Sequence, residues 1–448
     1  MRTALAAVLV VAACSNNLHH GIDAPPTDVS IDTFGPDTGD PPPNAVKLVV
    51  TRGGAPVVGV TTRFQNADST LVHVSVTNDN GLAWTVMASG GFVTALERTS
   101  DGIDELTTFA DVQEADALRL DLDPTGDTAQ WPVVLGIPAD NGAVAYQVYT
   151  TCGGPFGIDP AQPTETLLVG CGGVADVVVV GEDGNGTPVR GLYAADLVVP
   201  EPPPPQETDA MPPAYPPLTV AGTYGALVTK SLSYVNVPAI VSFVGAYHSF
   251  ASSHGRVYER TAGDTPSGGA TSVAIQLPAA TAAALVATSL YSTDVGAQLI
   301  YDSLASGSSA AAYSLDVTAA LLPPFATPPA YDATIRTVTW TERTGAQVPE
   351  LVRTRIHAYR DAIPTGRAWG WRMIAPRTGT SVTFPQLPVF GFDFNPTSDD
   401  VVGVDELTTA SVPGTYHDAR PVGFTDLTSL VIGTTNRMVV QSLNALEP

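Results

Sequence analysis

The stretch LVHVSVTNDNG, residues 71–81, carries the two local signals that decide the fold class. Valine occupies every second position from 72 to 76, with Leu, His and Ser between, which is the period of a half-buried β-strand. Asn80-Gly81 follows, and this pair tolerates the positive φ angles of a hairpin turn. The stretch therefore predicts a strand, a turn and a second strand.

Segments rich in β-branched and aromatic residues recur along the chain. Turn-forming residues separate them, because the 448 residues include 41 Gly and 39 Pro. The expected strands include 143–152, 175–183, 222–235, 297–304 and 351–360. Residues 280–291 suit either a strand or a helix. The sequence thus predicts an all-β protein, a multi-domain string of β-sandwich modules.

The composition supports a folded body and excludes one class of partner. Hydrophobic residues make up 44% of the chain and charged residues only 14%, so burial can offset the entropy cost of ordering the chain. The net charge is -24 at pH 7. A surface of this sign repels phosphate backbones, so we expect no nucleic-acid partner.

The first residues have the layout of an export signal. Met1 and Arg2 give a positive start, and residues 4–13 are all apolar. Ten helical residues span about 15 Å, half of a hydrocarbon core, so the run is too short for a transmembrane anchor. No later stretch approaches 18 uninterrupted apolar residues.

Val11-Ala12-Ala13-Cys14 resembles the lipobox of bacterial lipoproteins, although the family prefers Leu where this chain has Val11. The resemblance implies cleavage before Cys14 and acylation of its thiol, which would make the lipid the only membrane attachment. An ordinary signal peptide with an incidental Cys14 is the alternative. Residues 20–43 contain six Pro and five Asp, which predicts that 14–45 form a disordered tether. This layout suggests the bacterial cell envelope, at the outer membrane or cell surface rather than the inner membrane.

Four modules are expected after the tether. Residues 46–124 contain GAPVVGV and TNDNG and resemble the carboxypeptidase regulatory-like or bacterial Ig-like families, which implies a small accessory β-sandwich of Ig-like or prealbumin-like type. A second sandwich covers 125–199, and a linker with nine Pro covers 200–217. A third sandwich covers 218–330, and a β-rich domain covers 331–448.

Cys152 and Cys171 are the only cysteines besides Cys14, and both precede Gly-Gly. In an exported protein such a pair predicts a disulfide. Closing a loop of about 20 residues would contribute on the order of 3 kcal/mol. Two distant thiols without a nearby His do not make a zinc site.

The usual catalytic and cofactor motifs are absent from the sequence. It contains no G-x-S-x-G, H-E-x-x-H, Cys-x-x-Cys, G-x-G-x-x-G or phosphate-binding loop, so we expect no cofactor and no metal. Two turns offer oxygen ligands that could bind calcium, 183–186 and 393–400, but neither has the EF-hand spacing. The simpler interpretation of 183–186 is a hairpin turn.

Residues 331–380 form the one stretch that stands out by a positive net charge, with eight Arg against four acids. If 351–360 is a strand, one face presents Arg353, Arg355, His357 and Tyr359, and extended 369–371 places Trp369 and Trp371 together. Arginine beside aromatic rings can bind an anionic or sugar-like ligand. The alternative is that the Trp rings fill the sandwich core while the arginine side is solvated or pairs with acidic neighbouring modules.

One phrase recurs, GIDELTT at 102–108 and GVDELTT at 403–409, which suggests a shared loop geometry rather than a repeat architecture. The sequence predicts a lipid-anchored envelope protein with a non-catalytic binding or structural role, whose partners are the membrane, through Cys14, and a protein or glycan of the cell surface. The competing hypothesis is a hydrolase of polysaccharide or peptide, because carboxylate pairs need not be close in sequence.

Overall fold

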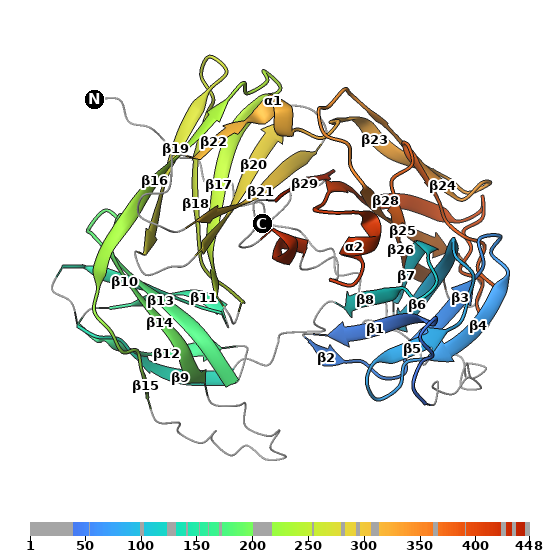
Figure 1. The fold of residues 1–448 in the computed structure, drawn as a ribbon, viewed down its shortest axis with the longest axis horizontal. Coiled ribbons are helices and arrows are strands. Elements are labelled where there is room, and N and C mark those ends of the chain that lie inside the picture. The colour runs from blue at the N-terminus through green and yellow to red at the C-terminus, as the bar shows by residue number, and fades with distance from the viewer. Residues whose placement is uncertain are drawn as a thin grey trace.

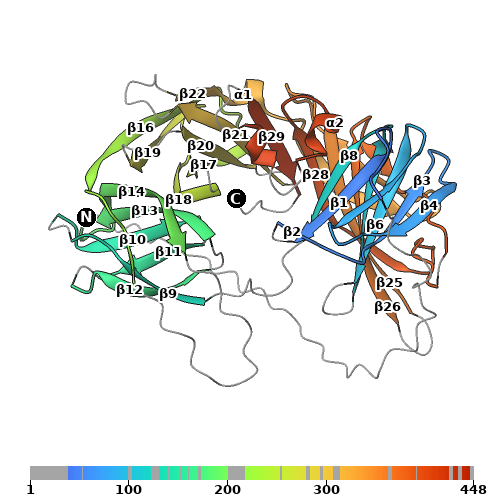
Figure 2. The ribbon, with the colours of Figure 1, turned by 60° about the horizontal axis from the view of Figure 1, so that its bottom comes forward.

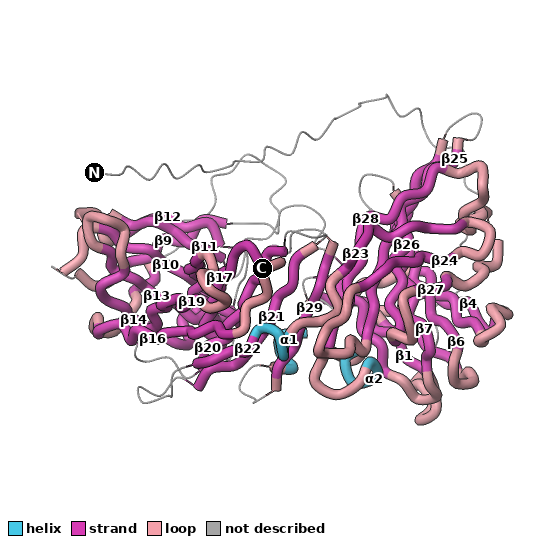
Figure 3. The backbone as a smooth tube through the Cα atoms, turned by 90° about the horizontal axis from the view of Figure 1, so that it is seen from above, coloured by secondary structure: helices cyan, strands magenta, loops and turns pink. Residues whose placement is uncertain are grey.

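The predicted all-β fold is confirmed in the computed structural model (Figure 1). It describes residues 39–52, 54–98, 103–122, 131–139, 142–151, 153–159, 161–169, 173–199, 217–252, 255–278, 283–292, 296–305, 313–361, 366–389, 391–422, 427–431 and 436–443. Within these ranges there are 29 strands and three helical turns, which are α1 (Val317–Ala320), α2 (Tyr416–Ala419) and the 3-10 turn η1 (Leu427–Leu430). Figure 3 shows α1 and α2 as short helices among the strands. No described helix is long and apolar enough to span a membrane.

A twelve-stranded sheet, here called the central sheet, runs through the whole body. Its order is β18 (Gly255–Asp264), β17 (Val241–Ser252), β20 (Ala283–Ser292), β21 (Ala297–Ala305), β29 (Arg437–Ser442), β28 (Val401–Ser411), β25 (Leu351–Arg360), β26 (Arg367–Pro376), β7 (Asp104–Val112), β6 (Gly91–Arg98), β3 (Thr61–Gln65) and β4 (Leu71–Val76). Neighbours are antiparallel except β26 and β7, which run parallel. The first and last parts of the described chain thus share one sheet.

Four smaller sheets pack against the central sheet or one another. The first contains β2 (Ala55–Pro56), β1 (Val46–Arg52), β5 (Leu82–Thr85) and β8 (Ala117–Leu122). The second contains β11 (Gly153–Ile158), β10 (Ala145–Thr150), β13 (Gly173–Glu182), β14 (Pro188–Val199), β16 (Gly225–Val235), β19 (Thr271–Pro278) and β22 (Tyr313–Asp316). The third contains β12 (Thr164–Val169), β9 (Trp131–Gly136) and β15 (Leu218–Thr219), and the fourth β23 (Phe325–Asp332), β24 (Thr337–Glu342) and β27 (Ser381–Thr383).

Strand pairing links all four stretches that the sequence divides into modules. β14 pairs with β16 across the proline-rich segment, and β7 of the first stretch pairs with β26 of the last. β29, close to the end of the described chain, lies between β21 and β28. Figure 2 shows the resulting arch, with β29 at the junction between its two halves.

The buried side chains form cores between facing sheets. One core lies between β23–β24–β27 and the middle of the central sheet, and it contains Trp340, Trp369 and Trp371. A second core lies between the β1 sheet, α2 and the opposite face of the central sheet. Two aligned sheets enclosing an apolar layer form a sandwich. The middle strands of the central sheet are therefore covered on both faces. The sheet of β23, β24 and β27 covers one face, and the β1 sheet and α2 cover part of the other.

The Asn80-Gly81 turn is present, but it does not form the expected hairpin. Gly81 N donates to Asn78 O over 2.8 Å, yet β4 pairs with β3 in the central sheet, while β5 pairs with β1. The turn thus carries the chain from one sheet to the facing one. Gly81 has φ +68°, and a Cβ there would approach the Val50 carbonyl to 2.4 Å, so glycine is required.

The choice between strand and helix at 280–291 is resolved. Residues 283–292 form β20, which pairs along its length with β17 and β21. Its Thr and Val content suits a central strand, and long-range pairing overrides the helix propensity of its alanines.

Candidate functional site

The outer face of β25 holds the residues that the sequence places on one strand face. Arg353, Arg355, His357 and Tyr359, here called the arginine strip, alternate with the buried residues of β25. Exposure rises along the strand, from buried Leu351 to Tyr359, which is 43% exposed. This gradient arises because the β1 sheet and α2 cover the Leu351 end of this face, whereas the Tyr359 end is uncovered.

The guanidinium groups of the arginine strip bind carboxylates of neighbouring strands. Arg355 donates to Glu105 of β7, with Nε 3.3 Å from Oε2, and its Nη1 lies 3.0 Å from Asp405 Oδ2. Arg353 bonds Glu406 of β28. Burial alone would lower the pKa of Arg355, but its hydrogen bond to Glu105 and the nearby acids raise it. Arg355 thus pairs with an acid of the first predicted module, one of the two states expected for these arginines, whereas Arg353 pairs with an acid of its own module.

His357 and Tyr359 are the accessible members of the strip. The His357 side chain is 52% exposed, and its Nδ1 bonds Asp405, which also binds Arg355. The ring lies over Gly403, where a Cβ would approach its Cε1 to 2.3 Å. Tyr359 stands opposite Val401, which is 67% exposed. The Tyr359 end of the strip thus exposes the rings of His357 and Tyr359 and the side chain of Val401. These groups follow the ion-paired Arg353 and Arg355 along the sheet.

Trp369 and Trp371 lie on the opposite face of the sheet from the arginine strip. Both are at most 1% exposed, and their cross-strand neighbours on β25 are Ala358 and Ile356. Trp371 Nε1 donates to Thr108 Oγ1 over 2.9 Å, and its ring packs edge-on against Phe384. The structure therefore brings the four strip residues together and places the two Trp rings in the core.

Both copies of the recurring DELTT phrase are strands, so the shared loop geometry that the sequence suggests is wrong, and the two strands have a common structural role. Both copies are strands of the central sheet, β7 and β28, and they flank the β25–β26 hairpin on either side. Each copy directs its Leu into the Trp core and its Glu onto the arginine strip, where Glu105 binds Arg355 and Glu406 binds Arg353. The two copies are thus acidic strands that flank one basic hairpin and form ion pairs with its arginines.

The oxygen-rich turn at 393–400 binds an arginine. Arg360 donates to both carboxylate oxygens of Asp400 over 2.7 Å, and to the carbonyls of Asp393 and Asn395 over 2.8 and 3.0 Å. The Asp400 side chain is 1% exposed. Burial would raise the pKa of Asp400, but hydrogen bonds from Arg360 and the Thr397 backbone hold it below its usual range. The oxygens that could bind calcium in this turn thus accept hydrogen bonds from the guanidinium group of Arg360.

The turn at 183–186 has the geometry of a hairpin connection. Asp183 Oδ1 accepts from the backbone of Asn185 and Thr187, each over 2.9 Å, and Gly186 has φ +73°. These bonds, chiefly that from Thr187, lower the pKa of Asp183. Over the described residues, no group of three or more His, Cys, Asp or Glu is arranged to hold a metal ion.

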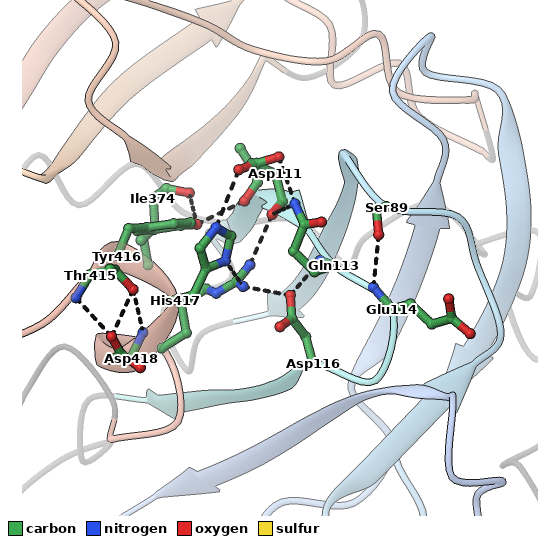
Figure 4. A network of polar contacts seen from close by, with 12 residues as sticks. Ser89, Asp111, Gln113, Glu114, Asp116, Ile374, Thr415, Tyr416, His417 and Asp418 are labelled. Carbon is green, nitrogen blue, oxygen red and sulfur yellow. Dashed lines mark hydrogen bonds and ion pairs between the residues drawn. The ribbon is translucent and has the colours of Figure 1, made fainter.

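A polar network around α2 was not predicted (Figure 4). Tyr416 donates to the carbonyls of Ala110 and Ile374 over 2.9 and 3.0 Å, and burial raises its pKa. Arg420 is fully buried, bonds His417, and lies 2.5 Å from Asp116. Thr415 and Asp418 form a capping box, the one local signal that could have revealed this helix. The network fixes the C-terminal part of the chain to the ends of β7 and β8.

Cys14, Cys152 and Cys171 lie outside the described residues, as do most of the tether and of the proline-rich linker. Lipidation and the disulfide therefore stay predictions.

Comparison with known proteins adds little. No family model matches the chain, and no curated protein matches it in sequence. Among solved structures, it is similar to the pilus adhesin SpaC of Lactobacillus rhamnosus GG at 10% identity and a TM-score of 0.13. That match covers 74% of this chain and 43% of the adhesin, so the chain spans less than half of the adhesin's length. A similarity of this size carries no argument about function.

Proposed function

We propose that this chain is a lipid-anchored protein of the bacterial cell envelope whose all-β body has a non-catalytic binding role at the cell surface. Anchoring is supported by the short apolar run that ends at Val11-Ala12-Ala13-Cys14 and by the acidic, proline-rich segment after it. A tether of this composition, which lies mostly outside the described residues, would let the folded body reach a ligand away from the membrane. The accessory-module resemblance of residues 46–124 agrees with this role.

The observation that carries the binding role is the uncovered end of the arginine strip. Arg355 is held by carboxylates of β7 and β28, and Arg353 by Glu406 of β28, so little side-chain entropy remains to be lost when a ligand binds beside them. His357 and Tyr359 follow these arginines along β25 and are exposed. Tyrosine is enriched at protein interfaces, and His and Tyr rings both combine an apolar body with a polar tip. The end of β25 is therefore the contact region that we assign to a cell-surface protein or glycan.

The test uses the two exposed residues, because substitution of the arginines would also break ties between strands. Binding of the full chain to isolated cell envelopes is compared for wild type, His357→Ala with Tyr359→Ala, and the control Val348→Ala. Val348 is 69% exposed and lies outside the strip. We expect at least tenfold weaker binding for the double variant, with unchanged thermal unfolding. Equal binding by all three proteins would contradict this assignment.

A further inference from the structure

His357 lies between two glycines on the outer face of the central sheet. In the strand register it stands opposite Gly370 of β26 and Gly403 of β28. A Cβ at Gly403 would come within 2.3 Å of the imidazole Cε1. A Cβ at Gly370 would come within 2.3 Å of Glu105 Oε2. The two glycines therefore leave the space that the His357 ring and the Glu105 carboxylate occupy.

Asp405 fixes the orientation and the tautomer of the His357 ring. Nδ1 of His357 donates to one carboxylate oxygen of Asp405, and the other oxygen lies 3.0 Å from Nη1 of Arg355. A carboxylate oxygen only accepts hydrogen bonds, so Nδ1 must carry the proton of this bond. In the neutral ring Nε2 is then unprotonated and is a hydrogen-bond acceptor.

This acceptor is available to a ligand. The His357 side chain is 52% exposed, and within the described part of the chain Nδ1 alone of its two ring nitrogens has a hydrogen-bond partner. Arg355, the nearest donor on the same strand face, is held by Glu105 and Asp405. Tyr359 follows on that face and is 43% exposed. The contact region thus presents a fixed acceptor beside an exposed aromatic ring.

The charged and titratable groups around His357 come from four strands. They are Arg353, Arg355 and Tyr359 of β25, Arg372 of β26, Glu105 of β7, and Asp405 and Glu406 of β28. The arginines stay charged, and each of the three carboxylates pairs with an arginine. An imidazole changes its charge between pH 5 and 8, so His357 is the member of this set that we expect to switch there.

We propose that His357, positioned by Asp405 and Gly403, is the hydrogen-bond acceptor of the contact region, which therefore takes a ligand group that donates, a hydroxyl or an ammonium. A proton from solvent adds to Nε2 and leaves the Nδ1 bond to Asp405 in place. The ring keeps its position, but its outward nitrogen changes from an acceptor to a donor, so the ligand is released in mild acid. This inference rests on the proposed binding role and adds the polarity and the pH dependence of the contact.

The tautomer is tested without a ligand. The full chain, carrying 15N-labelled histidine, is studied by NMR in detergent, and the His357 signals are identified by their loss in His357→Gln. At pH 7.5 we expect a protonated Nδ1 and an unprotonated Nε2. Gly403→Ala should change both shifts, because its Cβ displaces the ring. Gly157→Ala is the matched control, since Gly157 is an exposed strand glycine of β11 where a Cβ meets no atom within 4 Å.

The role in binding is tested with isolated cell envelopes at pH 7.5 and pH 5.5, with thermal unfolding measured for every protein at both pH values. We expect wild type and Gly157→Ala to bind about tenfold more weakly at pH 5.5, as for one lost hydrogen bond. His357→Phe keeps a ring without nitrogen, and it should bind about tenfold more weakly than wild type at pH 7.5. His357→Gln keeps an acceptor that gains no charge, so its binding should not depend on pH.

Four results would overturn the inference. They are a protonated Nε2 at pH 7.5, equal wild-type binding at both pH values, full binding by His357→Phe, and a pH dependence that persists in His357→Gln. If His357→Ala with Tyr359→Ala abolishes binding while wild-type binding does not change with pH, the proposed binding role stands and this inference alone fails. Equal binding by that double variant and wild type at pH 7.5 would contradict both.

Discussion

Arg367 Nη2 lies 2.6 Å from Asp104 Oδ2, although 263 positions separate the two residues in the sequence. Asp104 is 4% exposed, and the Arg367 guanidinium also lies 4.3 Å from the centre of the Phe392 ring. The contact ties β7 to β26, the one parallel pair of the central sheet. It joins the first module that the sequence predicts to the last.

Removal of the Asp104 charge should weaken this junction. We expect Asp104→Asn to lower the free energy of unfolding by about 1–3 kcal/mol, because it leaves a partly buried guanidinium without its carboxylate. Urea denaturation measures the change. Arg119→Gln is the control, since Arg119 pairs at a surface where its side chain is 43% exposed, and less than about 0.5 kcal/mol is expected. Equal effects of both variants would contradict the structural role of Asp104.

The pair formed by Glu105 and Arg355 should show measurable coupling. Their side chains are 23% and 28% exposed, so solvent screens the attraction and we expect about 1 kcal/mol. A double-mutant cycle with Glu105→Gln and Arg355→Gln isolates this energy. Additive effects of the two substitutions would mean that the contact does not stabilise the sheet.

We expect Trp371 to stabilise the fold through the hydrogen bond of its indole N–H as well as through the volume of its ring. Trp371→Phe keeps an aromatic ring and leaves the buried Thr108 hydroxyl without this donor, so we expect a loss of about 1–3 kcal/mol in the free energy of unfolding. If the bond matters, Trp371→Phe should cost less when Thr108→Val is already present. The same cost in both backgrounds would show that only packing is lost.

The Arg360–Asp400 contact should contribute a pH-dependent part of stability. Asp400 has a folded pKa below its unfolded value of about 3.9, so its contribution is complete above about pH 4 and is lost as the pH falls through the folded pKa. Asp400→Asn should therefore be less stable than wild type at pH 6, and the gap should narrow at pH 2.5. A stability gap of the same size at pH 6 and pH 2.5 for Asp400→Asn would contradict the assignment.

Local signals predicted the strands well because alternation and turn residues are readable over a few positions. Strand β25 and the separation of its two faces follow from alternation alone, but alternation left open whether its arginines are solvated or paired with acids of neighbouring modules, and only Arg355 pairs with such an acid, Glu105. The partner strands could not be predicted, since pairing of β7 with β26 depends on contacts over 260 residues apart. For the same reason the hairpin expected at Asn80-Gly81 was wrong, because a turn does not reveal which sheet receives the next strand.

Lipid anchoring through Cys14 is tested most directly by metabolic labelling with a radioactive or clickable palmitate in a bacterial host, followed by membrane fractionation. If Cys14 is acylated, the wild-type chain takes up label and sediments with membranes, whereas Cys14→Ser takes up none and is released or accumulates with its leader uncut. Cys152→Ser should keep both label and membrane association. Labelling and membrane retention of Cys14→Ser equal to wild type would contradict the claim that this protein acts from a lipid anchor.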